Sequence, residues 1–122
     1  MKDVIIIEDD PAMAMINQKL IERLGYTVVN NSLQSSEAIS FLSTNKVDLI
    51  LLDIMLDEEI DGIEVAKIIR TQSNAPIIFI SSLIEPEINI KINEIENTQL
   101  LFKPLDYNEL QHAIGMVSIL KS

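Results

Sequence analysis

The sequence predicts an α/β protein, a doubly wound (βα)5 arrangement in which helices cover both faces of a five-stranded parallel sheet. Short apolar, β-branched runs alternate along the chain with longer amphipathic segments. Four of these five runs are continuously apolar, as in parallel strands that are buried on both faces. The 122 residues, of which 48% are hydrophobic, suit a single domain covering residues 1–122.

Five strands are expected, and the segments between them are long enough to hold crossover helices. The predicted strands are 4–7 (VIII), 26–29 (YTVV), 47–52 (VDLILL), 76–80 (PIIFI) and 100–102 (LLF). β-Branched and aromatic residues favour these extended segments. Strand–helix–strand crossovers within one sheet make its strands parallel.

The first helix is expected to begin at Pro11, a favoured opening position, and to end at Gly25. Asp10, directly before the proline, is expected to cap this helix rather than to bind metal. Met15 falls opposite the predicted inward stripe, and Ala14 lies beside that exposed side. The helical spacing predicts an inward stripe made of Met13, Ile16, Leu20 and Leu24.

A second helix is predicted from about Ser36 to Thr44, with Ser35 or Ser36 as its cap. A third is predicted over roughly 62–71. Its apolar spacing predicts a buried face of Ile63, Val65, Ala66 and Ile69.

The fourth crossover, EPEINIKINEIEN, fits both a strand period and a helical period. We expect a short helix, because the flanking strands need a crossover. Its helical stripe would be Ile84, Ile88, Ile92 and Ile95, and Ile90 would lie off it. The last helix is expected to start at Asp106, which has Glu109 three residues later, the spacing of a capping box.

Charge and composition exclude several classes of function. Nine Lys and Arg against nineteen Asp and Glu give a net charge of -10, which opposes direct binding to nucleic acid or to an anionic membrane. No stretch approaches the length of a membrane span, and the start lacks the order of a signal peptide. The chain has no cysteine, so disulfides and thiolate chemistry are excluded. A cytoplasmic protein is expected.

Polar residues follow four of the predicted strands. They are Glu8, Asp9 and Asp10 after the first strand, Asp53 after the third, Ser81 at the end of the fourth, and Lys103 with Pro104 after the fifth. In a doubly wound sheet, ligands bind at the carboxyl ends of the strands, where all of these residues fall. Clustered carboxylates repel one another by roughly 4 kcal/mol per close pair at an effective dielectric near 20, so a cation is expected among them.

Four stretches carry a resemblance that spans the chain: IIIEDDP, LILLDIML with DGIEVAKIIR, PIIFISS and LLFKPLD. In this order and at strand ends, they resemble the receiver domain of response regulators, the CheY-like superfamily. The resemblance implies the flavodoxin-like strand order 2-1-3-4-5. It also implies a two-component signalling domain, not a conventional enzyme, that assists phosphorylation and dephosphorylation of its own Asp53. The phosphoryl donor would be a sensor histidine kinase or a histidine phosphotransfer protein.

The chemistry of the polar residues agrees with this resemblance. The Asp53 carboxylate can attack phosphorus to form an aspartyl phosphate. Asp9 and Asp53 are suitable Mg²⁺ ligands, and Glu8 would hold a metal-bound water. Lys103 would neutralise Asp53 at rest and a phosphoryl oxygen after transfer, and the Ser81 hydroxyl would donate to another phosphoryl oxygen.

Three further features are implied by the resemblance or depart from it. The family implies that the Met55 backbone carbonyl is a further metal ligand and that the Lys103–Pro104 bond is cis. Where the family has proline, Asp57 stands, and the loop DEEIDG is one residue longer and more acidic. Leu100 stands where the family carries an aromatic switch residue, with Phe102 beside Lys103 instead.

These departures keep an alternative open, a phosphorylation-independent adaptor with the same fold. A metal-dependent phosphatase with an Asp nucleophile is disfavoured, because Met55 stands where such enzymes have a second acid two residues after Asp53. Flavin binding is disfavoured, because the acidic first loop would repel the cofactor phosphate. The lone His112 is expected to be a solvated residue of the last helix rather than a ligand.

Two surfaces are expected to bind partners. The resemblance implies docking of the phosphodonor at the first helix, where Met15 is expected to be exposed. It implies a downstream protein partner at the fourth helix, fifth strand and fifth helix, where Ile90 is exposed. A homodimer is left open. Since nothing follows the fifth helix, we expect a stand-alone regulator or a domain of a longer protein, with no DNA-binding or enzymatic output in this chain.

Overall fold

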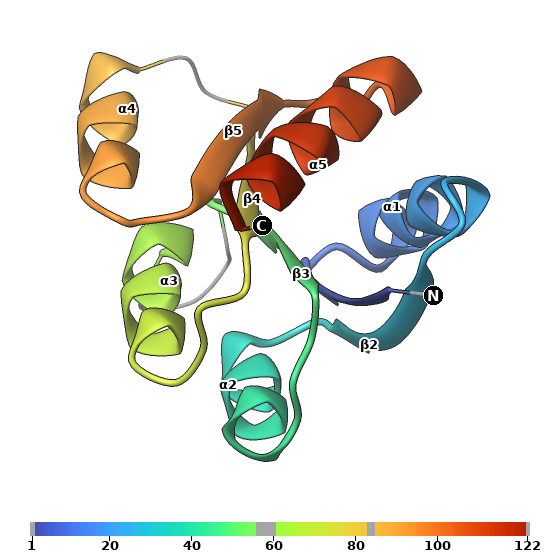
Figure 1. The fold of residues 1–122 in the computed structure, drawn as a ribbon, viewed down its shortest axis with the longest axis horizontal. Coiled ribbons are helices and arrows are strands. Elements are labelled where there is room, and N and C mark those ends of the chain that lie inside the picture. Colours follow the sequence, from blue (N-terminus) through green and yellow to red (C-terminus); the bar gives the residue numbers. More distant parts are fainter. Residues whose placement is uncertain (1, 56–60, 83–84, 122) are drawn as a thin grey trace.

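The computed structural model describes residues 2–55, 61–82 and 85–121. Within these residues, five strands alternate with five helices along the chain (Figure 1). The strands are β1 (Asp3–Ile7), β2 (Thr27–Ser32), β3 (Leu49–Asp53), β4 (Ile77–Ser81) and β5 (Thr98–Phe102). The helices are α1 (Pro11–Arg23), α2 (Ser35–Thr44), α3 (Gly62–Arg70), α4 (Pro86–Asn93) and α5 (Tyr107–Lys121).

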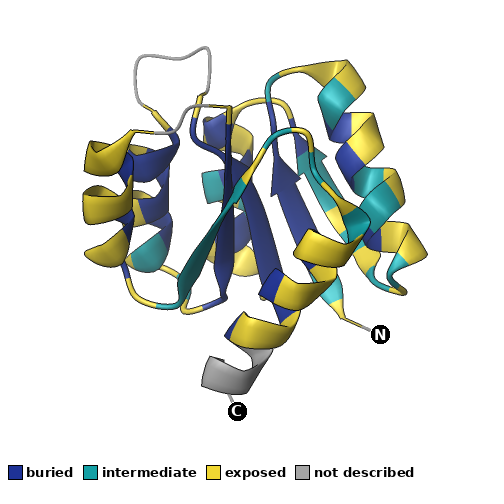
Figure 2. Cartoon of the chain, turned by 90° about the horizontal axis from the view of Figure 1, so that it is seen from above, coloured by how far each residue is buried: buried dark blue, intermediate teal, exposed yellow. Residues whose placement is uncertain are grey.

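The strands form one parallel sheet in the order β2-β1-β3-β4-β5, which confirms the predicted fold class. Helices α1 and α5 cover one face of the sheet, and α2, α3 and α4 cover the other (Figure 1). In Figure 2 the central strands are buried along their length, while each helix buries only its inner face. Burial on both faces explains the continuous apolar runs within β1, β3 and β4, which are Val4–Ile7, Leu49–Leu52 and Ile77–Ile80.

Successive residues of one strand enter two different cores, because side chains alternate across a sheet. In β1, Ile5 and Ile7 pack on the side of α2, α3 and α4, whereas Val4 and Ile6 pack on the side of α1 and α5. The sheet therefore holds both layers of helices at once and fixes where each strand ends.

The largest difference in strand bounds is in β2, which continues three residues past its predicted end at Val29. Asn30, Asn31 and Ser32 pair with Ile5, Ile6 and Ile7 after an irregularity in the register. Asn31 also donates through Nδ2 to the Ala14 carbonyl at 3.1 Å, which ties this edge strand to α1. Backbone pairing and these side-chain bonds outweigh the low strand preference of asparagine.

The predicted inward stripe of α1 is only partly right, since Leu20 and Leu24 pack against the core but are not its most buried residues. Ile16 is 50% exposed, and Met13, Leu20 and Leu24 are only partly buried. The fully buried residues are Ala14, Asn17 and Ile21, on the neighbouring stripe. The predictions that Met15 is exposed and that the helix ends at Gly25 are confirmed, since Met15 is 60% exposed and Gly25 has φ of +93°. Ala14, expected beside the exposed side, is buried and lets α1 approach the sheet closely.

The predicted helix caps are confirmed at two helices and wrong at one. The Asp10 side chain accepts a hydrogen bond of 3.0 Å from the backbone two residues on, and Asp106 accepts one of 3.0 Å from the Glu109 N–H. In α2 the cap residue is Gln34, which makes no side-chain capping bond, and Ser35 is already helical. In α3 the four residues predicted to be buried are all buried.

Helix α4 is short, as predicted, with Ile88 and Ile92 buried and Ile95 buried just beyond its end. Ile90 is 61% exposed, as expected from its position off this stripe. Ile84 and the loop residue Asp57 lie outside the described residues. No helix in the described part of the chain is both long and apolar enough to cross a membrane.

Candidate functional site

The polar residues predicted from the sequence lie together at the carboxyl edge of the sheet. Glu8 directly follows β1, Asp53 and Ser81 close β3 and β4, and Lys103 directly follows β5. The register aligns these ends, because Asp53 pairs with Ile80 and the backbone N–H of Lys103 donates to the Ser81 carbonyl at 2.8 Å. The parallel sheet thus places groups from four strands at one site.

Lys103 is the cation of this site. Its Nζ lies 2.8 Å from Asp53 Oδ2 and 3.4 Å from Glu8 Oε1, while its side chain is 21% exposed. Burial alone would lower the pKa of Lys103, but the hydrogen bond and charge of Asp53, with the charge of Glu8, raise it above the ordinary value. Because of this raised pKa, Lys103 stays charged and satisfies one oxygen of Asp53.

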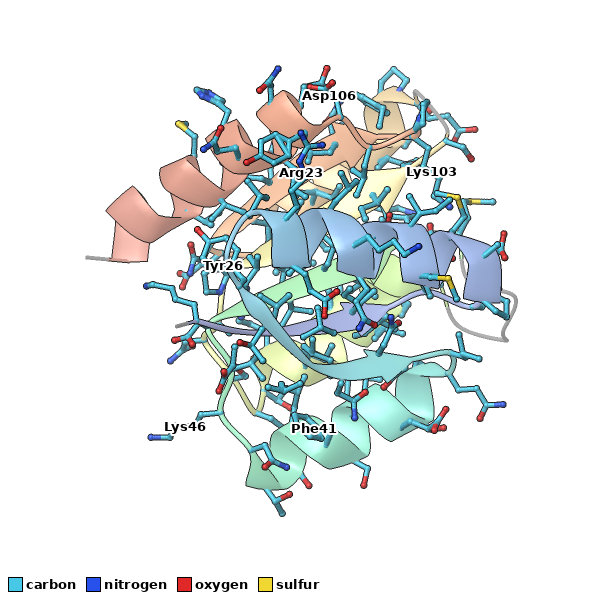
Figure 3. All side chains as sticks on the ribbon, turned by 90° about the vertical axis from the view of Figure 1, so that its right-hand side faces the viewer. Arg23, Tyr26, Phe41, Lys46, Lys103 and Asp106 are labelled. Carbon is cyan, nitrogen blue, oxygen red and sulfur yellow. The ribbon has the colours of Figure 1, made fainter. Side chains whose placement is uncertain are left out.

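Figure 3 shows Lys103 near the amino-terminal end of α1, with Arg23 nearer the opposite end beside α5.

Glu8 is poorly stabilised as an ionised carboxylate. It is buried, and its Oε2 accepts a long hydrogen bond of 3.3 Å from the Asp10 backbone. Its Oε1 has no hydrogen bond of ordinary geometry among the described residues. Burial raises the pKa of Glu8 to about 8, and the negative charge of Asp53 acts in the same direction. The free domain therefore favours a protonated Glu8 near neutral pH.

Glu8, Asp9 and Asp53 can each present a carboxylate oxygen, and these oxygens lie within 4.8 Å of one another. Hard divalent cations such as Mg²⁺ prefer oxygen ligands of this kind. A further positive charge here would stabilise the ionised form of Glu8, whose Oε1 has, among the described residues, only the 3.4 Å ion pair with Lys103. The donor set therefore fits a divalent cation, whereas Asp10 is engaged as the cap of α1.

Asp53 is buried and held from two sides. Its Oδ1 accepts a 2.9 Å hydrogen bond from the Met55 backbone, and its Oδ2 accepts the bond from Lys103. Gly62, which sequence reasoning did not single out, contributes through close packing. A Cβ at this position would lie 2.3 Å from the Asp53 carbonyl oxygen and 2.6 Å from Ile54 Cα. Only glycine lets α3 start this close to the end of β3, and its position after Asp61 at a helix start was the available signal.

The structure also shows where the other residues singled out from the sequence lie. Ser81 is fully buried at the end of β4. Leu100 is partly buried against the core on the side of α2, α3 and α4, while Phe102 is 37% exposed. The Lys103–Pro104 bond is cis, as the resemblance implied. His112 is exposed, as predicted for a solvated residue.

The site and fold define a class of protein, the receiver domains of two-component response regulators. Residues 4–115 match the family of the response regulator receiver domain, and the chain belongs to this family. It is therefore a signalling domain of the CheY-like type, as the sequence predicted.

Two transcriptional regulatory proteins of Bacillus subtilis are similar in sequence to this chain. The chain is 32% identical over 117 residues to the alkaline phosphatase synthesis transcriptional regulatory protein PhoP of Bacillus subtilis (strain 168), covering 95% of this chain and 48% of PhoP. It is 34% identical over 79 residues to the transcriptional regulatory protein YvrH of the same organism, covering 65% of this chain and 33% of YvrH. The chain thus spans between a third and about half of the length of these relatives.

Solved structures show the same fold. The receiver domain of the Francisella response regulator 1452 has a TM-score of 0.86 at 27% identity, with 100% of both chains covered. The N-terminal domain of a response regulator/sensory box/GGDEF 3-domain protein from Carboxydothermus hydrogenoformans has a TM-score of 0.87 at 29% identity, covering 98% of this chain and 96% of that one.

Proposed function

We propose that this domain, residues 1–122, accepts a phosphoryl group on Asp53 in the cytoplasm, in the presence of Mg²⁺, and thereby changes a surface that binds a protein partner. The observation that supports this most directly is the surroundings of Asp53. A buried carboxylate at a strand end lies 2.8 Å from Lys103 and within 4.8 Å of two further carboxylates. Such a set can hold a cation and a transferred phosphoryl group together.

The donor would be a phosphohistidine of a sensor histidine kinase or of a histidine phosphotransfer protein. An Asp53 carboxylate oxygen forms a bond to phosphorus, the P–N bond of the donor breaks, and the imidazole leaves with the electron pair. Lys103 would move its contact from Asp53 Oδ2 to a phosphoryl oxygen, and the Ser81 hydroxyl would donate to another. Hydrolysis of the acyl phosphate by water would return the domain to its starting state.

The metal would be held by Asp9 and Asp53, with Glu8 through a water and the Met55 backbone carbonyl as a further ligand. The Met55 N–H already bonds to Asp53 Oδ1, so the backbone at 55 lies beside the acceptor. When bound, Mg²⁺ would neutralise the carboxylates and the charge of the phosphoryl oxygens. The buried Glu8, whose Oε1 has the 3.4 Å ion pair with Lys103 but no hydrogen bond within the described part of the chain, supports a role for such a charge.

The partner surface we propose consists of α4, β5 and α5. Apolar side chains are exposed on each of these elements, at Ile90, Phe102 and Met116. A groove of about 480 Å³ runs between β5 and α5, with Leu100 and His112 among its lining residues. Carboxylates outnumber cations between residues 85 and 117, so a cationic, apolar protein segment fits this surface better than nucleic acid or a second copy of the chain. Gel filtration of the phosphorylated and free domain would test for a homodimer.

The alternative, an adaptor that needs no phosphorylation, has one observation in its favour. Leu100 occupies the place of the family's aromatic switch residue and is already packed against the core. An adaptor would bind its partner equally well before and after exposure to a phosphodonor.

Intact mass separates the two functions. The domain is incubated with acetyl phosphate and Mg²⁺, and the expected result is the addition of one phosphoryl group. Asp53→Asn should abolish the adduct. The control Asp106→Asn should keep it, because Asp106 is an exposed cap residue that asparagine can replace. No adduct on the wild-type domain with any donor would refute phosphoryl acceptance.

A further inference from the structure

The two ends of α4 are attached to the rest of the domain very differently. At the carboxyl end, the guanidinium of Arg70 reaches across from the last turn of α3. Its Nη1 donates to the carbonyls of Ser73 at 2.9 Å and Ala75 at 2.7 Å, and its Nη2 donates to the carbonyl of Glu96 at 2.9 Å. One rigid, planar side chain thus joins the end of α3, the segment before β4 and the segment that follows α4.

Further bonds hold the same end. The Thr98 hydroxyl lies within hydrogen-bond distance of two carbonyls from the end of α4, 3.4 Å from Ile92 and 3.2 Å from Ile95. Asn97, which has a φ of +60°, donates through Nδ2 to the Asn74 carbonyl at 3.3 Å. The Ile92 and Ile95 side chains are buried in the core. The end of α4 is therefore fixed by packing and by side chains from two neighbouring segments.

Among the described residues, which leave out 83 and 84 directly before α4, the amino end has few such attachments. The cap residue Glu85 makes no side-chain capping bond, and Pro86 and Glu87 are exposed. The first buried side chain is Ile88. Because α4 follows β4 and runs back along the sheet, its amino end lies toward the edge where Ser81 closes β4, while its carboxyl end lies at the opposite edge. Within the part of the chain that the structure describes, the end with fewer attachments is the one toward the candidate site.

We infer that Arg70 makes the carboxyl end of α4 a pivot, so that a rearrangement at the site tilts this helix about residues 94–97 instead of shifting it as a whole. The trigger rests on the proposed phosphorylation of Asp53. Eight residues span about 12 Å at 1.5 Å per residue, so a tilt of about 10° moves the amino end by about 2 Å and leaves the carboxyl end in place. Such a motion changes the exposure of Ile90 without breaking the bonds to Arg70.

Distances between spin labels can test this pivot, because the chain has no cysteine of its own. Two doubly labelled proteins carry a shared reference at Glu37→Cys on α2 and a second label at either Glu87→Cys or Glu94→Cys. All three positions are exposed. On phosphorylation with acetyl phosphate and Mg²⁺, the distance from 37 to 87 should change by about 2 Å and the distance from 37 to 94 should stay constant.

The Arg70→Lys variant keeps the charge and loses the planar fork. In this variant the 37–94 distance should also change on phosphorylation, and its distribution should broaden. Arg23→Lys is the matched control, because Arg23 stacks on Tyr107 at 4.6 Å, on the other face of the sheet from α4. Equal changes at both ends of α4 in the wild-type domain, or no effect of Arg70→Lys, would overturn the pivot.

Intact mass on the same samples separates this result from the proposed function. If Asp53 takes up no phosphoryl group, the proposed function fails, and the pivot is judged on the free domain. There the 37–94 distribution should be narrower than the 37–87 distribution, and Arg70→Lys should remove the difference. Equal widths in the free wild-type domain would then refute the pivot.

Discussion

Replacing Glu8 with glutamine is expected to stabilise the metal-free domain at pH 8. The pKa of Glu8 is about 8 in the folded domain, against 4.5 for an ordinary glutamate. Between these values the folded state holds a proton that the unfolded chain has lost. The free energy of unfolding should therefore fall as the pH rises through this window, and level off above about pH 8.

The size of this effect follows from the two pKa values. The difference between them corresponds to a loss of roughly 5 kcal/mol at most in the free energy of unfolding. The slope is at most about 1.4 kcal/mol per pH unit. Glutamine carries no charge at any pH, so Glu8→Gln should remove most of the slope. Millimolar Mg²⁺ should flatten the slope of the wild-type domain, because a divalent cation favours the ionised carboxylates.

Urea unfolding in EDTA at pH 5, 6.5 and 8 provides the measurement. Circular dichroism is the suitable probe, because the chain has no tryptophan. Glu22→Gln is the matched control, because it makes the same chemical change on the exposed side of α1. This variant should keep the wild-type slope. A wild-type slope between pH 5 and 8 no steeper than that of Glu8→Gln would refute the reasoning.

Three further predictions concern stability and can be checked by the same urea titrations. Gly62→Ala should cost about 1–3 kcal/mol or more, because its Cβ would overlap the Asp53 backbone, whereas Gly115→Ala, with open space around it in α5, should stabilise by about 0.5–1 kcal/mol. Equal effects at the two glycines would contradict the close packing of α3 on β3. Ile92→Ala should cost about 2–4 kcal/mol and Ile90→Ala less than about 0.5 kcal/mol, and comparable losses would show that α4 is packed differently. Asn17→Leu should stabilise by about 1–2 kcal/mol, because both polar atoms of this buried amide lack a partner among the described residues; a loss of stability would reveal one.

The strands could be predicted from the sequence because continuous apolar runs such as Leu49–Leu52 have few other ways to be buried. The buried face of α1 could not be predicted in this way. The larger residues at 13, 16, 20 and 24 satisfied a helical spacing, but the sheet instead meets the stripe of Ala14, Asn17 and Ile21. A small residue allows close approach, and the cost of burying an amide is not visible in a pattern of apolar residues. The extension of β2 through Asn30 and Asn31 likewise depends on pairing with β1.

At the candidate site, the sequence predicted which residues meet, because each follows a strand and parallel strands end at one edge. Their ionisation could not be predicted, since it depends on the burial of Glu8 and on its distance from Lys103. The role of Arg70 had no signal either. An arginine at the end of an amphipathic helix is usually a solvated residue, and its three carbonyl partners come from loops that only the folded chain brings together.

The strand order also affects how this domain can be monitored as it folds. Glu8 lies near the start of the chain and Lys103 near its end, and their contact requires β1, β3, β4 and β5 to be in one sheet. Parallel pairings of this kind close long loops and are slow steps in folding. Formation of the Glu8–Lys103 contact would therefore report that β5 has joined the sheet. A shortened chain that ends before β5 would keep Glu8, Asp9 and Asp53 and lose the ammonium group that contacts Glu8 and Asp53.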